Sequence, residues 1–409
     1  MVMNYTLMHG NIPVCDLEVH GKYGSVEGVG NIHNPNRLPI GVEVGNGTDR
    51  ALLNNWWERR SIPASRDNIG AALEALGINT SPALAVKSLG LSLSDHYWIK
   101  PINTKLEWSD VNFYDNAFSG DVGDVLVNNK SGNISNTDFN TPDSVADGVV
   151  KKRWTIINGV RVLLKGGKSP FYQEPFNEII ASKIISLLGF NAVNYYLYNY
   201  SGELYSACEC FTDINTELVP AAGIYKSQER LPGVSKYEHF ISQCNRYNIG
   251  NFNNELDKMM IVDYIIGNSD RHFNNFGFMR DTNTLEWRGF APIYDNGMSL
   301  WCDVLTPGSM IQFKPFDKAH LEQLQAVNNL NVCDISRLGN VRDIILDTYS
   351  LSNNITKNRA AAIADAVVNN VALLNKMIKL GDKAGYIDVG SDPYLNKKYS
   401  NSKNEEANY

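Results

Sequence analysis

Residues 150–212 alternate between strand-like and helix-like patterns of apolar positions. A helical pattern over 173–188 separates two strand-like runs from two later ones, so the predicted order is β-β-α-β-β. The Asn-Gly pair at 158–159 and the Ser-Gly pair at 201–202 favour tight turns that join neighbouring strands as hairpins. The strand-like runs are 152–157, 160–165, 191–199 and 204–212.

After residue 215 apolar residues recur mainly at helical spacing. The clearest case has Ile363, Val367, Val371, Leu374 and Ile378 on one face. A small antiparallel sheet followed by helices predicts an α+β fold. Helices are expected over 255–266, 317–328, 336–349 and 357–380.

The first part of the chain differs in composition and in its pattern of apolar residues. Its opening 50 residues are rich in Gly and Asn, helical patterns begin near Ala51, and an aromatic-rich stretch follows. Residues 119–148 are rich in Gly, Asn, Asp and Ser, which predicts a boundary there. We therefore expect an accessory N-terminal domain over 1–140, a sheet-containing lobe over 141–215, a helical lobe over 216–392 and a flexible tail over 393–409.

Composition narrows the class of protein. The chain has 409 residues, of which 43% are hydrophobic and 20% charged, so it can bury a large core without disulfides. Its net charge of −7 gives no basic field, so nucleic acid and anionic membranes are not indicated as partners. No apolar run approaches the roughly 20 residues that span a bilayer. Scattered cysteines without a CxxC pair predict a cytoplasmic protein.

Three polar residues form the most informative pattern. Asp270 and Asn275 stand five residues apart after a predicted helix, and Asp295 ends an apolar run 25 residues after Asp270. Phosphoryl transfer from ATP needs one carboxylate to orient the attacking hydroxyl, together with an amide oxygen and a second carboxylate for Mg²⁺. We predict these roles for Asp270, Asn275 and Asp295 respectively. A polar loop and an Asx-turn are the structural alternatives.

A lysine and a glutamate upstream complete the pattern. Lys165 ends the strand that follows the first hairpin, and Glu178 lies 13 residues later on the amphipathic helix. Kinases hold the ATP phosphates with a strand lysine that pairs with a helix glutamate. An exposed strand end and a solvated helix start are the alternatives for these two residues.

The combined pattern resembles the HipA-like kinase family. Asn-Ser-Asp-Arg-His-x-x-Asn-Phe, from 268, resembles its catalytic loop, Ile-Tyr-Asp295 its metal-binding strand end, and Val-Leu-Leu-Lys165 its ATP-lysine strand. The order of these segments matches over about residues 141–380. The resemblance implies a bilobal kinase-like fold. It also implies an ATP- and Mg²⁺-dependent protein serine/threonine kinase with Asp270, Asn275 and Lys165 as catalytic residues.

The resemblance implies further site residues and partners. Backbone near Glu209 and Phe211 would receive adenine, and the segment 141–148 would form the phosphate loop, followed by Lys151 or Lys152. Ser144 in that loop, or as the second choice Thr141, would lie beside ATP and become self-phosphorylated, since the family's loop serine is linked to self-inactivation. The structural alternative is that Ser144 caps a turn in a linker. A protein substrate and an antitoxin or regulatory partner are implied. The residue before Asn275 is Asn274, where the family often has lysine.

Two other functions remain open at this point. One is a kinase for a lipid headgroup or a small alcohol, because phosphatidylinositol kinases share the Asp-Arg-His-x-x-Asn pattern. The other is a non-catalytic regulatory scaffold with a kinase fold. The stretch Trp-Trp-Glu-Arg-Arg at 56–60 could contact a partner or nucleic acid. Tryptophans are usually buried and charged residues usually exposed in proteins, which favours a buried aromatic pair with a solvated charged face.

Overall fold

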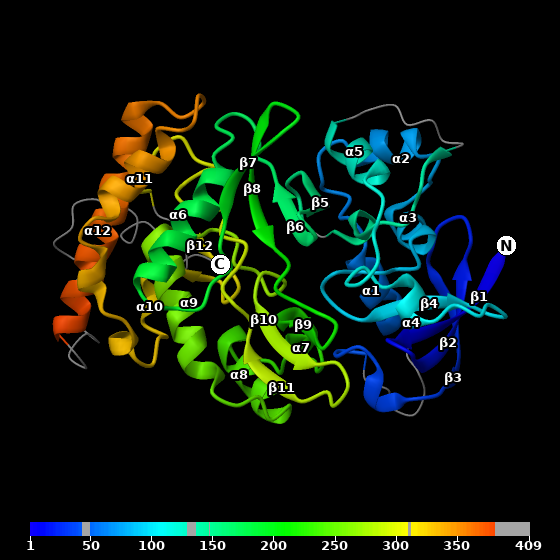
Figure 1. Cartoon of the computed structure of the whole chain (residues 1–409). Helices are drawn as coiled ribbons and strands as arrows, with labels where there is room; N and C mark the ends of the chain where they lie inside the picture. The colour runs from blue at the N-terminus through cyan, green and yellow to red at the C-terminus, as the bar shows by residue number, and fades with distance from the viewer. Residues whose placement is uncertain (43–49, 129–135, 147, 310–311, 381–409) are drawn as a thin grey trace, which may run out of the picture.

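A computed structural model describes residues 1–42, 50–128, 136–146, 148–309 and 312–380. In Figure 1 the N-terminal region (residues 1–128) lies to the right, and the C-terminal helices α11 (Val341–Tyr349) and α12 (Lys357–Leu380) lie to the left. A sheet of four strands, named here the central sheet, stands between them. The predicted strand-like run that includes Val44 and the predicted tail fall outside the described residues.

The N-terminal region is built on an antiparallel sheet with strand order β3-β2-β1-β4. Its core includes Leu7, Val14, Leu17 and Trp57, all buried. The strands are β1 (Val2–His9), β2 (Ile12–His20), β3 (Val26–Ile32) and β4 (Tyr97–Pro101). The helices are α1 (Arg50–Arg60), α2 (Ile69–Ala75), α3 (Ser81–Lys87), α4 (Trp108–Val111), and the short 3-10 helix η1 (Pro35–Arg37).

The polar segment 119–148 contains a helix where the sequence predicted only a boundary. Helix α5 (Asp121–Asn128) buries Val122, Val125 and Leu126 against α2 and α3, while Val127 packs on the central sheet. A 3-10 helix, η3 (Pro142–Val145), follows. The segment therefore joins the N-terminal region to the central sheet through apolar contacts on both sides.

The central sheet confirms the predicted β-β-α-β-β order. Its strand order is β5-β6-β8-β7, and both predicted hairpin turns have positive φ angles at their two central residues. Helix α6 (Glu174–Leu187) packs on this sheet through a buried face. The strands are β5 (Lys152–Ile157), β6 (Val160–Lys165), β7 (Tyr196–Tyr200) and β8 (Glu203–Glu209).

A third sheet, of order β11-β10-β9, lies below the central sheet in Figure 1 and is followed by helices. Its strands are β9 (Thr216–Pro220), β10 (Gly277–Asp281) and β11 (Trp287–Phe290). The main core packs α6 against the helices after residue 220. These are α7 (Ala221–Tyr225), α8 (Lys236–Arg246), α9 (Phe252–Ile266), α10 (His320–Leu324), α11 and α12.

Two helix predictions were wrong in extent. The expected helix over 317–328 is only α10, because Lys318–Ala319 pairs as strand β13 with β12 (Gln312–Phe313). At its end, the backbone N–H groups of Asn328 and Asn329 donate to the Asp257 carboxylate instead of continuing a helix. The expected helix over 336–349 is broken between η5 (Ile335–Leu338) and α11, and η4 (Leu330–Val332) precedes it.

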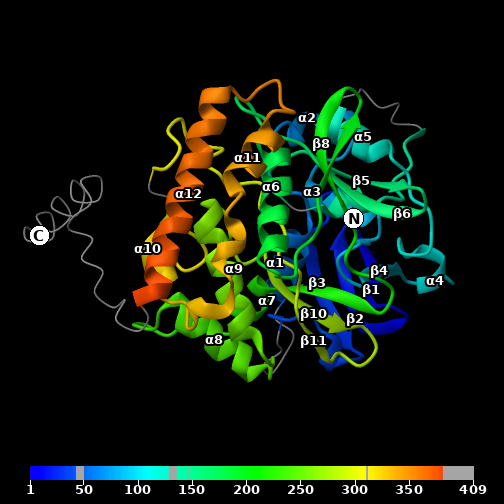
Figure 2. The ribbon, with the colours of Figure 1, turned by 60° about the vertical axis from the view of Figure 1, so that its left-hand side comes forward.

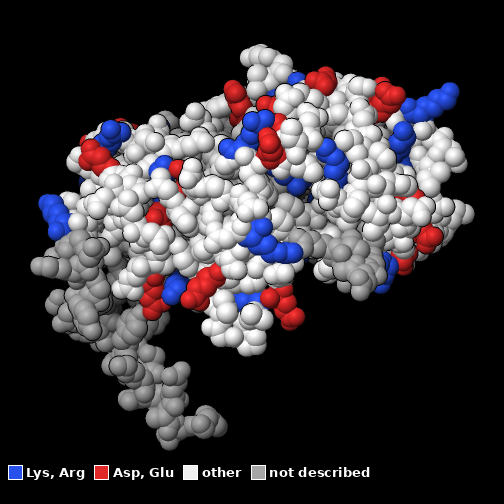
Figure 3. Space-filling model, turned by 90° about the horizontal axis from the view of Figure 1, so that it is seen from below, with Lys and Arg blue, Asp and Glu red and all other residues white. Residues whose placement is uncertain are grey.

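Helix α12 has the length and mean hydropathy of a membrane span, but it packs as a core helix. Ile363, Val367 and Leu374 are fully buried in the main core, and Figure 2 shows α12 lying along α11 and α9. The face in Figure 3 carries Lys, Arg, Asp and Glu interspersed on a largely uncharged surface.

Candidate active site

A cleft of about 730 Å³ collects most of the residues that the sequence singled out. It lies among the central sheet, the loop after α9, the segment around Tyr294 and helix α1 of the N-terminal region. Glu178 is not a lining residue but contacts one. The predicted residues that line the cleft are Lys165, Glu209, Phe211, Asp270, Asn275 and Asp295.

Lys165 is the centre of a buried ion cluster. Its Nζ lies 2.7 Å from Glu178 Oε1 and 2.8 Å from Asp295 Oδ1, and it also donates to the Tyr195 hydroxyl at 3.2 Å. Burial alone would lower the pKa of Lys165, but Asp295 and Glu178 outweigh it and raise that pKa well above its usual value. The lysine is therefore a permanent cation fixed at the floor of the cleft.

Glu178 holds this cluster from helix α6. Its side chain is 1% exposed, and its second oxygen accepts the backbone N–H of Asn296 at 2.8 Å. The glutamate thus ties the strand lysine to the chain segment that carries Asp295. The structure brings together the lysine and the glutamate that sequence spacing paired.

Asp295 stands in a left-handed backbone conformation, with φ of +57°, directly before Asn296 and Gly297. Its Oδ2 lies 3.8 Å from the Lys152 ammonium. Burial would raise the pKa of Asp295, but the charges of Lys152 and Lys165 outweigh it and hold that pKa well below its usual range. The carboxylate therefore stays ionised at any physiological pH.

The loop after α9 presents Asp270 and Asn275 to the cleft. The Asn275 amide donates to the backbone carbonyl of Asp270 at 2.9 Å, which orients the side chain. Asp270 Oδ1 accepts from Lys314 Nζ at 2.9 Å, and His272 Nε2 lies 3.8 Å from Asp270 Oδ2. One short loop thus places a carboxylate and an amide on the same side of the cleft.

Arg271 holds this loop in place. It is fully buried and pairs with Asp263 of α9 through several hydrogen bonds, the pair's Nη2–Oδ1 distance being 2.9 Å. The same guanidinium donates to the carbonyls of Asn275 and Tyr294 and to Asn296 Oδ1. It therefore links the helix, the Asp270 loop and the Asp295 segment into one unit.

Asn275 and Asp295 fit a divalent cation that prefers oxygen ligands. Both line the cleft, one supplies an amide oxygen and the other a permanent carboxylate, as Mg²⁺ requires. Among the described residues no group of three or more His, Cys, Asp or Glu side chains is placed to hold a metal ion. A cation bound here would therefore complete its shell with oxygens from a ligand and water.

The wall near Glu209 and Phe211 is mainly apolar. Strand β8 ends at Glu209, and the next backbone N–H, that of Cys210, donates to the Arg161 carbonyl at 2.8 Å. The Phe211 ring packs against Tyr294, with centroids 5.4 Å apart. Leu163, Cys208, Phe211, Leu218 and Tyr294 line this wall, which suits a flat aromatic heterocycle.

Ser144 is placed away from the cleft surface. It is fully buried in η3, and its hydroxyl has no hydrogen-bond partner among the described residues, whereas Pro142, Val145 and Ala146 on either side line the cleft. Burial raises the pKa of the neighbouring Asp143 to about 7. The segment borders the cleft, but the serine itself does not reach it.

Sequence reasoning missed two residues of this site and left a third undecided. Arg271 and Lys314 were not singled out, and Lys152 was only one of two candidate phosphate-loop cations. For Arg271 the sequence does hold a local signal, because an arginine directly after Asp270 can reach back to an acid on the preceding helix. Lys314 is 44 positions from Asp270, and no local pattern connects them.

Comparison with known proteins relates the chain to serine/threonine kinases and HipA. It is 28% identical over 142 residues to serine/threonine-protein kinase CtkA of Helicobacter pylori strain J99, a match that covers 31% of this chain and 40% of that protein. The chain thus spans about two fifths of the length of this curated relative.

Two solved structures are similar in fold. HipA of Shewanella oneidensis MR-1, from a complex with HipB and operator DNA, matches with a TM-score of 0.53 and 15% identity over 91% of this chain and 97% of that one. The likeness therefore extends into the N-terminal region. The H. pylori proinflammatory kinase CtkA matches with a TM-score of 0.42 and 20% identity over 56% of this chain and 94% of that one.

The family model described as "HipA-like C-terminal domain" matches residues 148–372. These residues contain the whole ion cluster, the Asp270 loop and the apolar wall. Because the match covers more than half of the chain, the chain belongs to the HipA-like family.

Proposed function

We propose that this chain is an ATP- and Mg²⁺-dependent kinase that phosphorylates serine or threonine hydroxyls of proteins. One observation carries the proposal: a single cleft is lined by Lys165 and Asp295, with the buried Glu178 behind them, and by the Asp270–Asn275 loop. The family membership and the likeness to a curated serine/threonine kinase support it. In this proposal the central sheet is the N-terminal lobe and the helical region after β9 is the C-terminal lobe.

The roles follow from charge and position. Lys165 and Lys152 would hold the phosphates of ATP, while Asn275 and Asp295 would hold Mg²⁺, which neutralises charge on the phosphates when bound. Glu178 keeps Lys165 in the cleft independently of Asp295, because its own contact to the ammonium is buried. Adenine would lie on the apolar wall beside Glu209 and Phe211.

Asp270 would orient the acceptor hydroxyl and take its proton. Its carboxylate is partly exposed to the cleft, and one of its oxygens is held by Lys314. The second oxygen, Oδ2, lies 3.8 Å from His272 Nε2, accepts no hydrogen bond among the described residues, and could accept one from a substrate hydroxyl. Lys314 also places a cation beside the catalytic loop, where Asn274 stands instead of the lysine frequent in the family.

Self-phosphorylation of Ser144 is a further part of this proposal, and it needs a change of structure. Ser144 is fully buried, so its hydroxyl reaches a bound phosphoryl group only if the Pro142–Val145 turn leaves its present position. A phosphate carries about two negative charges and would not return to a site beside the buried Asp143. Phosphorylation would therefore favour the displaced turn and lower activity.

A regulatory protein partner is also proposed. The support is the fold likeness to a HipA protein that was solved in complex with HipB and operator DNA. Co-purification of the full chain with a tagged product of a neighbouring gene, followed by sizing, would test this separately from the kinase activity.

The test of the reaction class is phosphosite mapping. Wild type and Asp270→Asn are incubated with a dephosphorylated lysate, ATP and Mg²⁺, and modified peptides are identified by mass spectrometry. We expect phosphoserine or phosphothreonine on lysate proteins, and on Ser144, with wild type alone. Phosphate found only in the lipid or small-molecule fraction would favour the lipid-headgroup or small-alcohol kinase, and no ATP-dependent transfer would favour the non-catalytic scaffold.

A further inference from the structure

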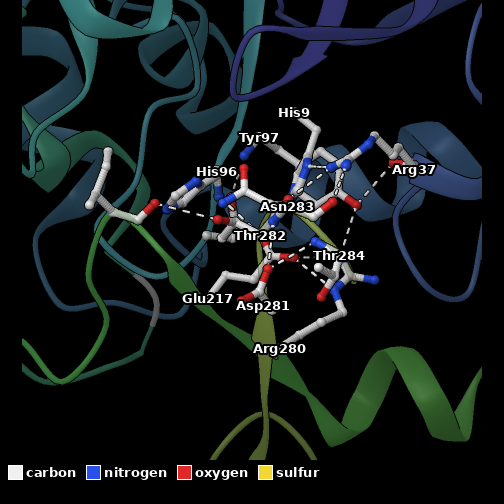
Figure 4. Close-up of polar contacts among 12 residues, drawn as sticks. His9, Arg37, His96, Tyr97, Glu217, Arg280, Asp281, Thr282, Asn283 and Thr284 are labelled. Atoms are coloured by element: carbon white, nitrogen blue, oxygen red, sulfur yellow. Dashed lines mark hydrogen bonds and ion pairs between the residues drawn. The ribbon is translucent and has the colours of Figure 1, made fainter. Parts of the chain in front are cut away.

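The N-terminal region is fixed to the kinase-like part by a buried charge network, shown in Figure 4. Glu217 on β9 accepts from Arg280 on β10 at 2.8 and 2.5 Å, and its other oxygen lies 3.0 Å from His9 Nε2 at the end of β1. Burial would raise the pKa of Glu217, but Arg280 and His9 outweigh it and lower that pKa strongly. Elements far apart in the chain therefore share one ion cluster.

Two further contacts extend this network from the N-terminal side. Arg37 donates to His9 Nδ1 at 2.7 Å and to the carbonyls of Thr282 and Asn283 at 2.9 and 2.6 Å. Tyr97 on β4 accepts from Arg280 at 3.3 Å. The N-terminal region is thus held in one orientation, and any part of it that borders the cleft is a fixed part of the site.

Two parts of the N-terminal region border the cleft: the segment 92–95 before β4, and helix α1. Trp56, Arg59 and Arg60 of α1 line the cleft together with Asp270 and Asn275. This is the Trp-Trp-Glu-Arg-Arg stretch for which the sequence favoured a buried aromatic pair. The structure confirms that interpretation for Trp57, which is 1% exposed and donates its indole N–H to the Gly24 carbonyl.

The two arginines of this stretch differ in their contacts. Arg60 pairs with Asp95, donates to the Gly90 and Tyr97 carbonyls, and stacks on Trp56 at 4.9 Å. Arg59 has no carboxylate within 4 Å among the residues that the structure describes. Arg60 is therefore a structural anchor, while the guanidinium of Arg59 is exposed in the cleft without an ion pair there.

Arg59 stands on the acceptor side of the cleft. It lines both the main cleft and a smaller adjoining hollow, and Asn274 of the Asp270 loop lines the same two spaces. Lys226, which follows α7, lies near enough to Arg59 to feel its charge: burial and then the Arg59 charge lower the pKa of Lys226. Of the lysines that line the cleft, Lys152, Lys165 and Lys314 already face carboxylates. Lys168 also lines the cleft, on the side of the central sheet, and its ammonium has no carboxylate within 4 Å among the described residues.

We propose that Arg59 is a specificity-determining residue that binds a carboxylate of the acceptor protein next to the phosphorylated hydroxyl. The inference rests on the proposed kinase function and adds the chemistry of its substrate: a serine or threonine in an acidic segment. A guanidinium pairs with a carboxylate through two parallel hydrogen bonds, which gives both charge and orientation. A protein segment is favoured over nucleic acid because the proposed reaction takes a protein hydroxyl, and one guanidinium suits a single carboxylate better than a row of backbone phosphates.

The test uses an array of serine and threonine peptides in which one glutamate or one lysine is moved through the positions around the acceptor. The full-length protein is applied with Mg²⁺ and ATP to measure phosphorylation, and labelled Asp270→Asn protein is applied to measure binding alone. Variants are Arg59→Glu, Arg59→Ala and Arg59→Lys. The matched control is Arg246→Glu, which reverses an exposed arginine on α8 that does not line the cleft.

We expect wild type to select glutamate over lysine by about tenfold at one or two positions, in binding and in phosphorylation. Arg59→Ala should lose this selection, Arg59→Glu should reverse it towards lysine, Arg59→Lys should keep part of it, and Arg246→Glu should behave as wild type. Phosphorylation with no acidic preference, or with a preference that Arg59→Glu leaves intact, would overturn the inference while the proposed function stands.

Two other outcomes separate the inference from the proposed function. Binding that depends on glutamate and on Arg59, without any phosphate transfer, would support the acidic-segment site and contradict the kinase assignment. A single-stranded RNA oligonucleotide that binds wild type and is lost in Arg59→Glu, with peptide selection unchanged, would overturn the inference in favour of a nucleic-acid contact.

Discussion

Replacement of Lys165 by Met should expose how much the buried ion cluster depends on one cation. The side chains of Lys165 and Glu178 are 7% and 1% exposed. Removal of the ammonium therefore leaves the Glu178 carboxylate buried, with the Asn296 N–H as its one remaining donor among the described residues. Asp295 still faces Lys152 at 3.8 Å. Breaking a buried pair on one side costs about 3–5 kcal/mol, and we expect a loss of that size.

The assay is urea-induced unfolding followed by tryptophan fluorescence, which gives the free energy of unfolding for each variant. Lys165→Met combined with Glu178→Gln should regain a large part of the loss, because the second change removes the uncompensated charge. Lys376→Met, on the exposed side of helix α12, is the control and should change stability by less than about 0.5 kcal/mol. A loss below about 1 kcal/mol in Lys165→Met, or no recovery in the double variant, would refute this account of the cluster.

Three more predictions concern the metal site, a buried acid and the charge network. Asp295→Asn should weaken Mg²⁺-dependent ATP binding by at least about tenfold in calorimetry, since an amide lacks the anionic ligand; unchanged binding would remove the metal role. Burial raises the pKa of Asp143 to about 7, so its protonated form stabilises the fold at acid pH, and this stabilisation is lost as pH rises through 7. Asp143→Asn should therefore melt at a higher temperature than wild type at pH 8 but not at pH 4, and a difference that is the same at both pH values would contradict this. Arg280→Met should lose about 3–5 kcal/mol in urea unfolding, and the addition of Glu217→Met should restore part of it; additive losses would be the contrary result.

Local patterns predicted the central sheet and the order of the site segments. The Asn-Gly and Ser-Gly turns carry their own backbone preference, so both hairpins could be placed from a few residues. Lys165 ends strand β6, Glu178 lies in α6, and Asp270 and Asp295 lie in the loops after α9 and β11. The order of these segments along the chain was therefore readable from local patterns, and the fold brings Lys165, Asp270 and Asp295 to one cleft with Glu178 behind Lys165.

Features that depend on distant partners could not be predicted in this way. Helix α5 lies in a polar segment with a glycine at 123, and it is stabilised by apolar contacts on two sides that no local pattern reveals. The early end of α10 depends on Asp257, some 70 positions away, which takes the backbone donors of the next turn. Lys314 and Arg59 reach the cleft from separate regions, so only the three-dimensional arrangement relates them to Asp270.

The most direct test of the central claim separates chemistry from binding at Asp270. Phosphate transfer to the best lysate substrate is measured for wild type and Asp270→Asn under single-turnover conditions, and the Kd of ATP with Mg²⁺ is measured on the same samples. A group that only positions and deprotonates the hydroxyl acts in the transition state, so transfer should fall by about 10²–10⁴ while Kd changes by less than about twofold. Transfer that persists in Asp270→Asn, or falls only in proportion to a weakened Kd, would contradict the account.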